Sequence, residues 1–410
     1  MKPGTPGFIG DRLKEAREAR GISAVSLSDL IGVSKQAVSQ YENDKQSPRP
    51  EVLNEIASQL KLPISYFKFS QNIDIGTIFY RSMSAATKTA RIRAEKRYNW
   101  LRIIDSYIRE FVQFPKLNFP NFAMPSDPKH ISNEQIEEIA IQARRFWNIP
   151  DSEPINNMVS LLEQNGSIIA RDELEANTLD AFSDVFQTNL DSTFYIVLGL
   201  DKHIAVRSRF DSAHEYGHRV LHYNIDKSYL NRTMEYKLIE EQAHRFAGAF
   251  LLPANTFAGD FYSANLDALL SLKPKWHVSI AMMIKRAEDL KFISSEQARW
   301  LWISLSKRGW KLKEPLDDDI EIEHPQLLRK AFELIIDEKI QTRHDILFNI
   351  PLNPMDIEKL ANLKTGYLNE NEQKGNAQII TLKPRTTPNN ISTNNTGNNH
   401  SHILKFPKKS

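Results

Sequence analysis

Apolar residues recur at helical spacing along most of this chain, and strand-like patterns are confined to one stretch. Residues 8–68 contain five short helical patterns, and a long helical pattern covers 84–112. Three short runs, GSIIAR, DAFSDVF and TFYIVLGL, are rich in residues that favour strands. Two helices follow at about 206–222 and 236–251, and helical patterns continue to about 363. The pattern therefore predicts a mainly α chain with one small sheet.

Changes in composition divide the chain into five parts. Four prolines fall within residues 114–128, which is typical of a linker. From residue 369 onward the sequence is dominated by Asn, Thr, Lys and Pro, which cannot bury enough apolar surface to order themselves. We expect an all-α domain at 8–68, followed by a helical linker with a proline-rich segment at 69–130. An α+β core at 131–258, a helical C-terminal region at 259–366 and a disordered tail at 367–410 complete the chain.

Residues 24–43 have the pattern of two short helices joined by a tight turn. Gly32 occupies the turn, and Ser34 is suited to cap the second helix. We expect six apolar side chains to face a common core: Leu27, Leu30, Ile31, Val33, Val38 and Tyr41. The opposite face of the second helix is polar and suited to a DNA major groove. The candidate DNA-contacting residues are Ser34, Lys35, Gln36, Ser39, Gln40 and Asn43.

Local charge leaves the role of the first 110 residues open. Residues 10–68 hold nine Lys/Arg and eight Asp/Glu, so a plain helical bundle stays an alternative to DNA binding. Residues 81–109 hold eight Lys/Arg against two acidic residues. This basic stretch is either an extended phosphate contact or, as we favour, a solvated helix face or a partner of the acidic run 314–323.

A metal-site pattern lies in RSRFDSAHEYGHRVLH, residues 207–222. His214 and His218 are one turn apart on one helix face, about 6 Å from each other, so both can bind one ion. Glu215 lies between them and can take a proton from a water molecule at the metal. Because the chain has no cysteine, the ligands must be His, Asp or Glu. These residues predict a Zn(2+) site with Glu215 as the catalytic base.

A catalytic zinc site needs a third protein ligand and one open position. His222 lies roughly 12 Å along the helix axis from His214, which is too far to share one ion. We therefore expect His222 in the core or in support of a ligand. On the next helix, Glu240 borders the apolar stripe, whereas Glu241 falls on the opposite side. Periodicity selects Glu240 as the third ligand and places Glu241 in solvent.

Composition adds limits rather than a function. Charged residues make up 25% of the chain and apolar residues 41%, as in ordinary globular proteins. The N-terminus lacks the apolar stretch of a signal peptide, and no apolar run is long enough to cross a membrane. The net charge of +2 indicates that any nucleic-acid surface must be local. We expect a cytoplasmic protein without membrane contact.

Both parts of the chain resemble known families. The segments IGDRLKEAREARGIS, LSDLIGVSKQAVSQYEN and SPRPEVLNEIASQLKLPISYF resemble the XRE, or lambda-repressor-like, helix-turn-helix family. The pair RFDSAHEYGHRVLH and IEEQAHRFAGAFLLP is similar to the signature of ImmA/IrrE-type zinc metallopeptidases. The combined resemblance covers about residues 10–360. It implies an all-α DNA-binding domain fused to an α+β zincin-like peptidase domain.

The resemblance also implies roles for individual residues. His214 and His218 would be ligands with Glu240, and Glu215 would be the general base. The family usually has Asn or Asp four residues after the ligand glutamate, where this chain has His244. That departure leaves the orientation of Glu240 less determined. Three nearby residues stay open as the group that stabilises the transition state: Tyr216, His222 and Tyr223.

The expected function is transcriptional regulation coupled to limited proteolysis. The chain would bind double-stranded DNA, with a homodimer on a palindromic site, and would cleave a repressor-like protein or its own linker. One alternative is a transcription factor whose peptidase fold only senses a ligand. Another is the toxin or effector of a two-gene module. The intact HExxH motif favours catalysis, because a pure sensor need not keep Glu215.

Overall fold

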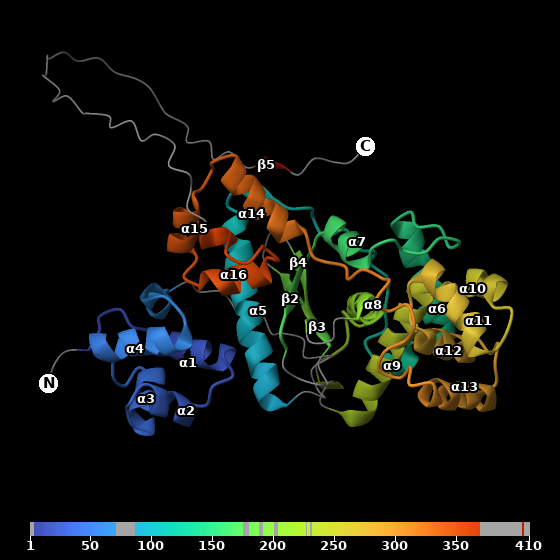
Figure 1. The fold of residues 1–410 in the computed structure, drawn as a ribbon, viewed down its shortest axis with the longest axis horizontal. Helices are drawn as coiled ribbons and strands as arrows, with labels where there is room; N and C mark the ends of the chain where they lie inside the picture. Colours follow the sequence, from blue (N-terminus) through green and yellow to red (C-terminus); the bar gives the residue numbers. More distant parts are fainter. Residues whose placement is uncertain are drawn as a thin grey trace, which may run out of the picture.

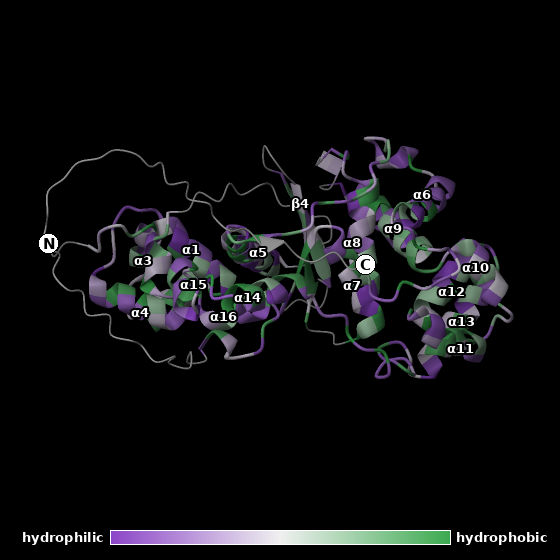
Figure 2. Ribbon diagram, turned by 90° about the horizontal axis from the view of Figure 1, so that it is seen from above, coloured by the Kyte–Doolittle hydropathy of each residue, from purple (hydrophilic) through white to green (hydrophobic). Residues whose placement is uncertain are grey.

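The computed structural model describes residues 4–70, 87–174, 180–187, 192–200, 204–226, 228–229, 232–369 and 404–405. Within them the protein is mainly helical with a small three-stranded sheet, as the sequence predicts. The molecule is elongated, with α1–α4 at one end and α10–α13 at the other (Figures 1 and 2). No helix in these ranges combines the length and the apolarity needed to cross a membrane.

The N-terminal unit is the predicted bundle of short helices. Ser34 Oγ accepts a hydrogen bond from the Ala37 amide and so caps α3, after Gly32 has turned the chain with a φ of 66°. One predicted core residue was wrong: Leu30 is 48% exposed, because Leu27 and Ile31 occupy the core side of α2. The unit comprises α1 (Gly10–Ala19), α2 (Ala24–Leu30), α3 (Lys35–Glu42), α4 (Pro50–Leu60) and the 3-10 helix η1 (Ile64–Lys68).

Helix α5 (Lys88–Ile108) is a central helix rather than a solvated linker (Figure 1). Trp100 is fully buried against Tyr66 of the N-terminal unit, and their ring centroids are 6.2 Å apart. Arg97 and Arg102, which belong to the basic stretch, are buried as well. Aromatic and acidic neighbours enclose both side chains. The predictions of a phosphate contact or a solvated helix face are therefore wrong for these two residues. A two-residue strand, β1 (Val112–Gln113), follows.

The three predicted strands form one sheet in the order β2–β4–β3. β2 (Ser167–Asp172) is parallel to β4 (Ser192–Gly199), and β3 (Ala181–Gln187) is antiparallel to it. The two faces of the sheet belong to different cores, because side chains alternate along each strand. Toward α5 the sheet presents Ile168, Ala170, Phe182, Tyr195 and Val197. Toward the opposite core it presents Ile169, Ala181, Phe194, Ile196 and Leu198.

The second core contains the helices that hold the candidate site. The two longest of them, α8 (Ala205–Leu221) and α9 (Thr233–Leu251), pack against each other beside the sheet (Figure 1). The others are η2 (Pro128–His130), α6 (Asn133–Phe146), α7 (Met158–Gln164), α10 (Ala254–Asp260), α11 (Leu266–Trp276), α12 (Ile280–Asp289) and α13 (Ser295–Lys307).

The C-terminal helices divide between the two cores. Whereas α10–α13 stay with α8 and α9, the last helices return to the core of α5 and the N-terminal unit. The predicted tail begins at 367, but η4 (Tyr367–Asn369) is still folded and Leu368 is buried. Of the remaining tail, only β5 (Leu404–Lys405), which pairs with β1, lies within the described residues. The returning helices are α14 (Leu327–Asp337), α15 (Arg343–Asn349) and α16 (Pro354–Leu360).

Candidate metal centre

Helix α8 carries the two histidines on one buried face. Their Nε2 atoms lie 3.0 Å apart, and His214 and His218 are 7% and 2% exposed. Residues four apart on a helix project from the same side, so this geometry follows from local structure alone. The pair supplies two of the three predicted ligands.

Glu240 of α9 completes the three predicted ligands. Its carboxylate oxygens lie 3.3 Å from Nε2 of His214 and 3.4 Å from Nε2 of His218. Glu241 is exposed, as helix phase predicts. The close approach of the helices depends on Gly217, where an added Cβ would lie 2.9 Å from Cδ1 of Phe246. Sequence reasoning missed this glycine, although its place within HEYGH was visible.

The three donors fit a zinc ion. With metal–ligand bonds of about 2.0 Å, neighbouring ligands of a tetrahedral ion lie roughly 3.3 Å apart. The distances of 3.0, 3.3 and 3.4 Å between the donor atoms match that spacing. Moreover, Oε1 of Glu240 is buried and accepts no hydrogen bond within the described chain. Neutral imidazoles with one carboxylate are a usual zinc set.

Electrostatics favours an ionised carboxylate here. Burial raises the pKa of Glu240, but His218 and His214 outweigh burial and hold the pKa well below its usual value. Burial lowers the pKa of His214, whereas Glu240, Glu215 and Asp211 raise it above its usual value. Protons therefore compete with a metal at His214, while Glu240 stays charged.

Glu215 lies on the neighbouring side of α8 and is held by the sheet. It is 2% exposed, and its Oε2 accepts a hydrogen bond from Ser183 Oγ of β3 at 2.5 Å. Strand β3, some thirty residues earlier in the chain, thus orients the Glu215 carboxylate. Nothing in the local sequence of α8 indicates Ser183.

His222 is hydrogen-bonded to the predicted ligand His218, which fits one of the two roles that the sequence left for it. Nε2 of His222 lies 3.1 Å from Oε1 of Gln242, whose amide nitrogen donates to the carbonyls of Pro128 and Ile131. Because those carbonyls can only accept, the amide oxygen must accept the Nε2 proton of His222. Nδ1 of His222 is then unprotonated and accepts from Nδ1 of His218, 3.1 Å away. This chain of bonds makes Nε2 of His218 the unprotonated nitrogen that a metal requires.

The residues proposed to contact DNA lie on the exposed side of α3 or at its ends. Lys35, Gln36 and Ser39 are exposed, and Gln40 is half-buried. Asn43 is exposed too, but its side chain donates to the carbonyl of Ser39 at 2.7 Å and so closes the end of the helix. Ser34 is occupied by its own capping bond.

Comparison with known proteins supports the two domains that the sequence predicts. Residues 13–67 match the sequence family described as helix-turn-helix, and residues 169–288 match the family described as IrrE N-terminal-like domain. The chain is a fusion of an XRE-type helix-turn-helix domain and an IrrE/ImmA-like domain. The IrrE-like match contains β3, β4, α8 and α9, and therefore all the residues of the candidate metal centre.

One curated relative covers the first domain. Over 60 residues the chain is 38% identical to the HTH-type transcriptional regulator SutR of Escherichia coli (strain K12). The similarity covers 15% of this chain and 34% of that regulator. It therefore concerns the helix-turn-helix domain and does not reach the IrrE-like domain.

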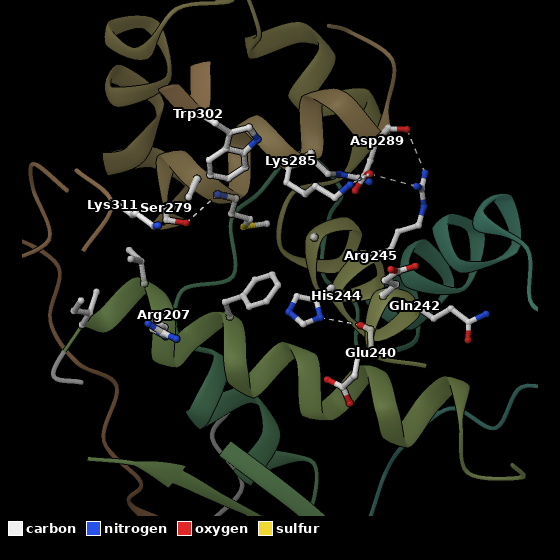
Figure 3. A pocket seen from close by; sticks show the side chains of 18 of the residues that line it. Arg207, Glu240, Gln242, His244, Arg245, Ser279, Lys285, Asp289, Trp302 and Lys311 are labelled. Atoms are coloured by element: carbon white, nitrogen blue, oxygen red, sulfur yellow. Dashed lines mark hydrogen bonds and ion pairs between the residues drawn. The ribbon is translucent and has the colours of Figure 1, made fainter. Parts of the chain in front are cut away.

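A cavity of about 940 Å³ opens beside the candidate metal centre. Glu240 and His244 line one wall, and α12, α13 and residues 310–317 line the other (Figure 3). Neither Tyr216, which is fully buried, nor His222 lines this cavity. Tyr223 donates to the carbonyl of Phe122. The three residues that the sequence left open for transition-state stabilisation therefore lie away from the cavity, whereas His244 faces it.

Proposed function

We propose that this chain is a DNA-binding transcriptional regulator with a zinc-dependent endopeptidase domain, which cleaves a repressor-like protein or itself to switch gene expression. The observation that carries the proposal is the convergence of His214, His218 and Glu240 beside the buried Glu215, on the same chain as a helix-turn-helix domain. The cavity at this centre gives a peptide segment a place to bind.

The chemistry assigns one task to each residue. Zinc held by His214, His218 and Glu240 would supply a Lewis acid that polarises the scissile carbonyl and makes water more acidic. Glu215 accepts the proton of the attacking water on its carboxylate and returns it to the leaving amine. Ser183 keeps the Glu215 carboxylate oriented through its hydrogen bond.

A reporter strain tests this function. Glu215→Gln removes the base and keeps all three ligands, so DNA binding should persist while switching is lost. Glu296→Gln, an exposed change on α13 that does not line the cavity, is the control and should switch normally. In parallel, purified protein should cut one of the products of neighbouring genes. Normal switching by Glu215→Gln would reject proteolysis.

The sensory alternative remains the second candidate because the cavity is large enough for a small ligand. On that alternative no bond is broken, so Glu215→Gln should switch like the natural protein. His214→Ala, which loses the metal, would then be the only one of the two variants that fails. The same reporter strain distinguishes the two candidates.

DNA binding is tested on the full chain, because the N-terminal domain shares its core with α5. Gln36→Ala should cost about 1–3 kcal/mol on the specific site and little on random DNA. Gln142→Ala, an exposed change on α6, is the control. An equal loss on both DNAs would show that Gln36 does not contact bases.

A further inference from the structure

Helices α8 and α9 each present a pair of donors one turn apart. On α8 the pair is His214 and His218, and on α9 it is Glu240 and His244. Donor atoms of His214, Glu240 and His244 all lie within 4.8 Å of one another, and those of His218 lie 3.0 and 3.4 Å from the first two. His244 therefore lies within reach of the same two residues, His214 and Glu240, that the peptidase chemistry assigns to the metal together with His218.

The hydrogen bond of His244 prepares it to bind a metal. Its Nδ1 lies 2.8 Å from the backbone carbonyl oxygen of Glu240. Figure 3 draws this hydrogen bond as a dashed line. Since a carbonyl only accepts, Nδ1 carries the proton and Nε2 is the unprotonated nitrogen. Histidine ligands in proteins commonly donate their other ring nitrogen to a backbone carbonyl in this way. The ring centroid of His244 is 4.4 Å from that of His214.

We propose that His244 is a fourth protein ligand, which occupies the open position of the metal until something entering the cavity displaces it. The inference rests on the proposed zinc site and adds its regulation. Catalytic zinc keeps an open position, whereas zinc with four protein ligands is closed. The side chain of His244 lines the cavity, so a peptide segment that fills the cavity contacts His244.

His244 is well placed for such a movement. It is exposed, unlike His214 and His218. Besides its bond to Glu240, it packs edge-on against His214, and its ring is tilted against that of Phe210 with centroids 5.5 Å apart. Rotation about its side-chain bonds would give up these two ring contacts and the bond to Glu240. The other three donors are held by helix packing and by the bonds of His222 and Gln242.

X-ray absorption spectroscopy of the full chain loaded with one equivalent of zinc tests the proposal. We expect three imidazoles per zinc in the natural protein, two in His244→Asn and three in His344→Asn, an exposed histidine on α15 that serves as control. His244→Asn should also bind zinc at least about tenfold more weakly in chelator competition, with an unchanged unfolding temperature.

The outcomes separate this proposal from the function on which it rests. Two imidazoles in both the natural protein and His244→Asn would overturn the fourth ligand and leave the zinc site intact. The same result with a reduced kcat in His244→Asn would assign His244 to the substrate instead. Loss of zinc from the natural protein, or its retention in His214→Ala, would overturn the zinc site itself.

Discussion

At the residue scale, the candidate site depends on which nitrogen of each histidine carries a proton. Two carbonyls of the segment around η2 orient the Gln242 amide, and through it they set the tautomers of His222 and His218. Glu215 is oriented from a different direction, by Ser183 of the sheet. The ligands and the base are thus controlled by separate neighbours, so their roles can be separated by mutation.

The adjacent glutamates of α9 provide the simplest test of the site. Glu240→Ala removes an inward carboxylate and should weaken zinc binding by orders of magnitude, because only two strong ligands of the set remain on α8. Glu241→Ala removes an exposed carboxylate and should change zinc binding little. Chelator competition on both variants measures the difference. The reverse order would show that Glu240 is not the ligand.

At the element scale, the distance between α8 and α9 decides whether the donors meet. Gly217 faces Ala243 and Phe246 of α9, and its lack of a side chain permits the contact. Phe246 is fully buried and packs on Tyr216, so it has little room to move. Small changes at this contact should affect both stability and metal binding.

Gly217→Ala should therefore destabilise the protein by about 1–3 kcal/mol, as overpacking of a dense core does, and should weaken zinc binding. Gly259→Ala is the control, because Gly259 lies in helix α10 and an added Cβ there meets nothing within 4 Å. The control should be neutral or stabilised by about 0.5–1 kcal/mol. Urea denaturation compares the two. Equal stability of both variants would contradict the tight helix contact.

A buried carboxylate connects α7 to α14. Glu163 accepts backbone hydrogen bonds from Gln326 and Leu327 at the start of α14, yet burial raises its pKa to about 7. Its ordinary value is 4.5, so between about pH 4.5 and 7 the folded state binds more protons than the unfolded state. Stability should therefore fall as the pH rises through this window.

Glu163→Gln should remove that part of the pH dependence, which amounts to about 3 kcal/mol at most. Thermal unfolding followed from pH 4.5 to 7.5 should be flatter for this variant than for the natural protein. Glu296→Gln, on the exposed first turn of α13, should keep the natural slope. An unchanged slope in Glu163→Gln would show that this carboxyl titrates normally.

At the scale of the whole molecule, charged side chains hold the helix-turn-helix domain to the IrrE-like domain. Asp356 of α16 accepts from Arg20 of α1 at 2.6 and 2.9 Å and from Arg97 of α5 at 3.1 Å. Arg97 also bonds Asp172 at the end of β2. The helix-turn-helix domain is therefore joined through α5 and α16 to the sheet that holds Glu215, which offers a physical route between the two proposed functions.

Asp356→Ala should cost about 3–5 kcal/mol, because it leaves the buried Arg97 and the half-buried Arg20 without this acceptor. Asp267→Ala removes a similar bidentate partner from Arg308, but Asp267 is 71% exposed, so its loss should change the stability little. Urea denaturation of the full chain measures both. A small cost at Asp356 would indicate that the two domains are joined mainly by apolar contacts.

Local periodicity was sufficient for much of this protein. The i, i+4 spacing of His214 and His218, the phase that separates Glu240 from Glu241, and the cap at Ser34 all depend on residues within one or two helical turns. Such features follow from the geometry of a single helix, so they do not depend on contacts with distant parts of the chain. The three strands were predicted for the same reason, since alternation and residue type mark them locally.

Tertiary structure alone decided the rest. The amphipathic pattern of α5 did not show that other parts of the protein would cover both of its sides. Its many charged residues led us to predict a solvated linker instead. Ser183, Gln242 and the α16 carboxylate at Asp356 act on partners 20 to 336 residues away. Contacts over such separations arise from how helices and strands pack, and no periodicity within a single element encodes which distant side chain will face it.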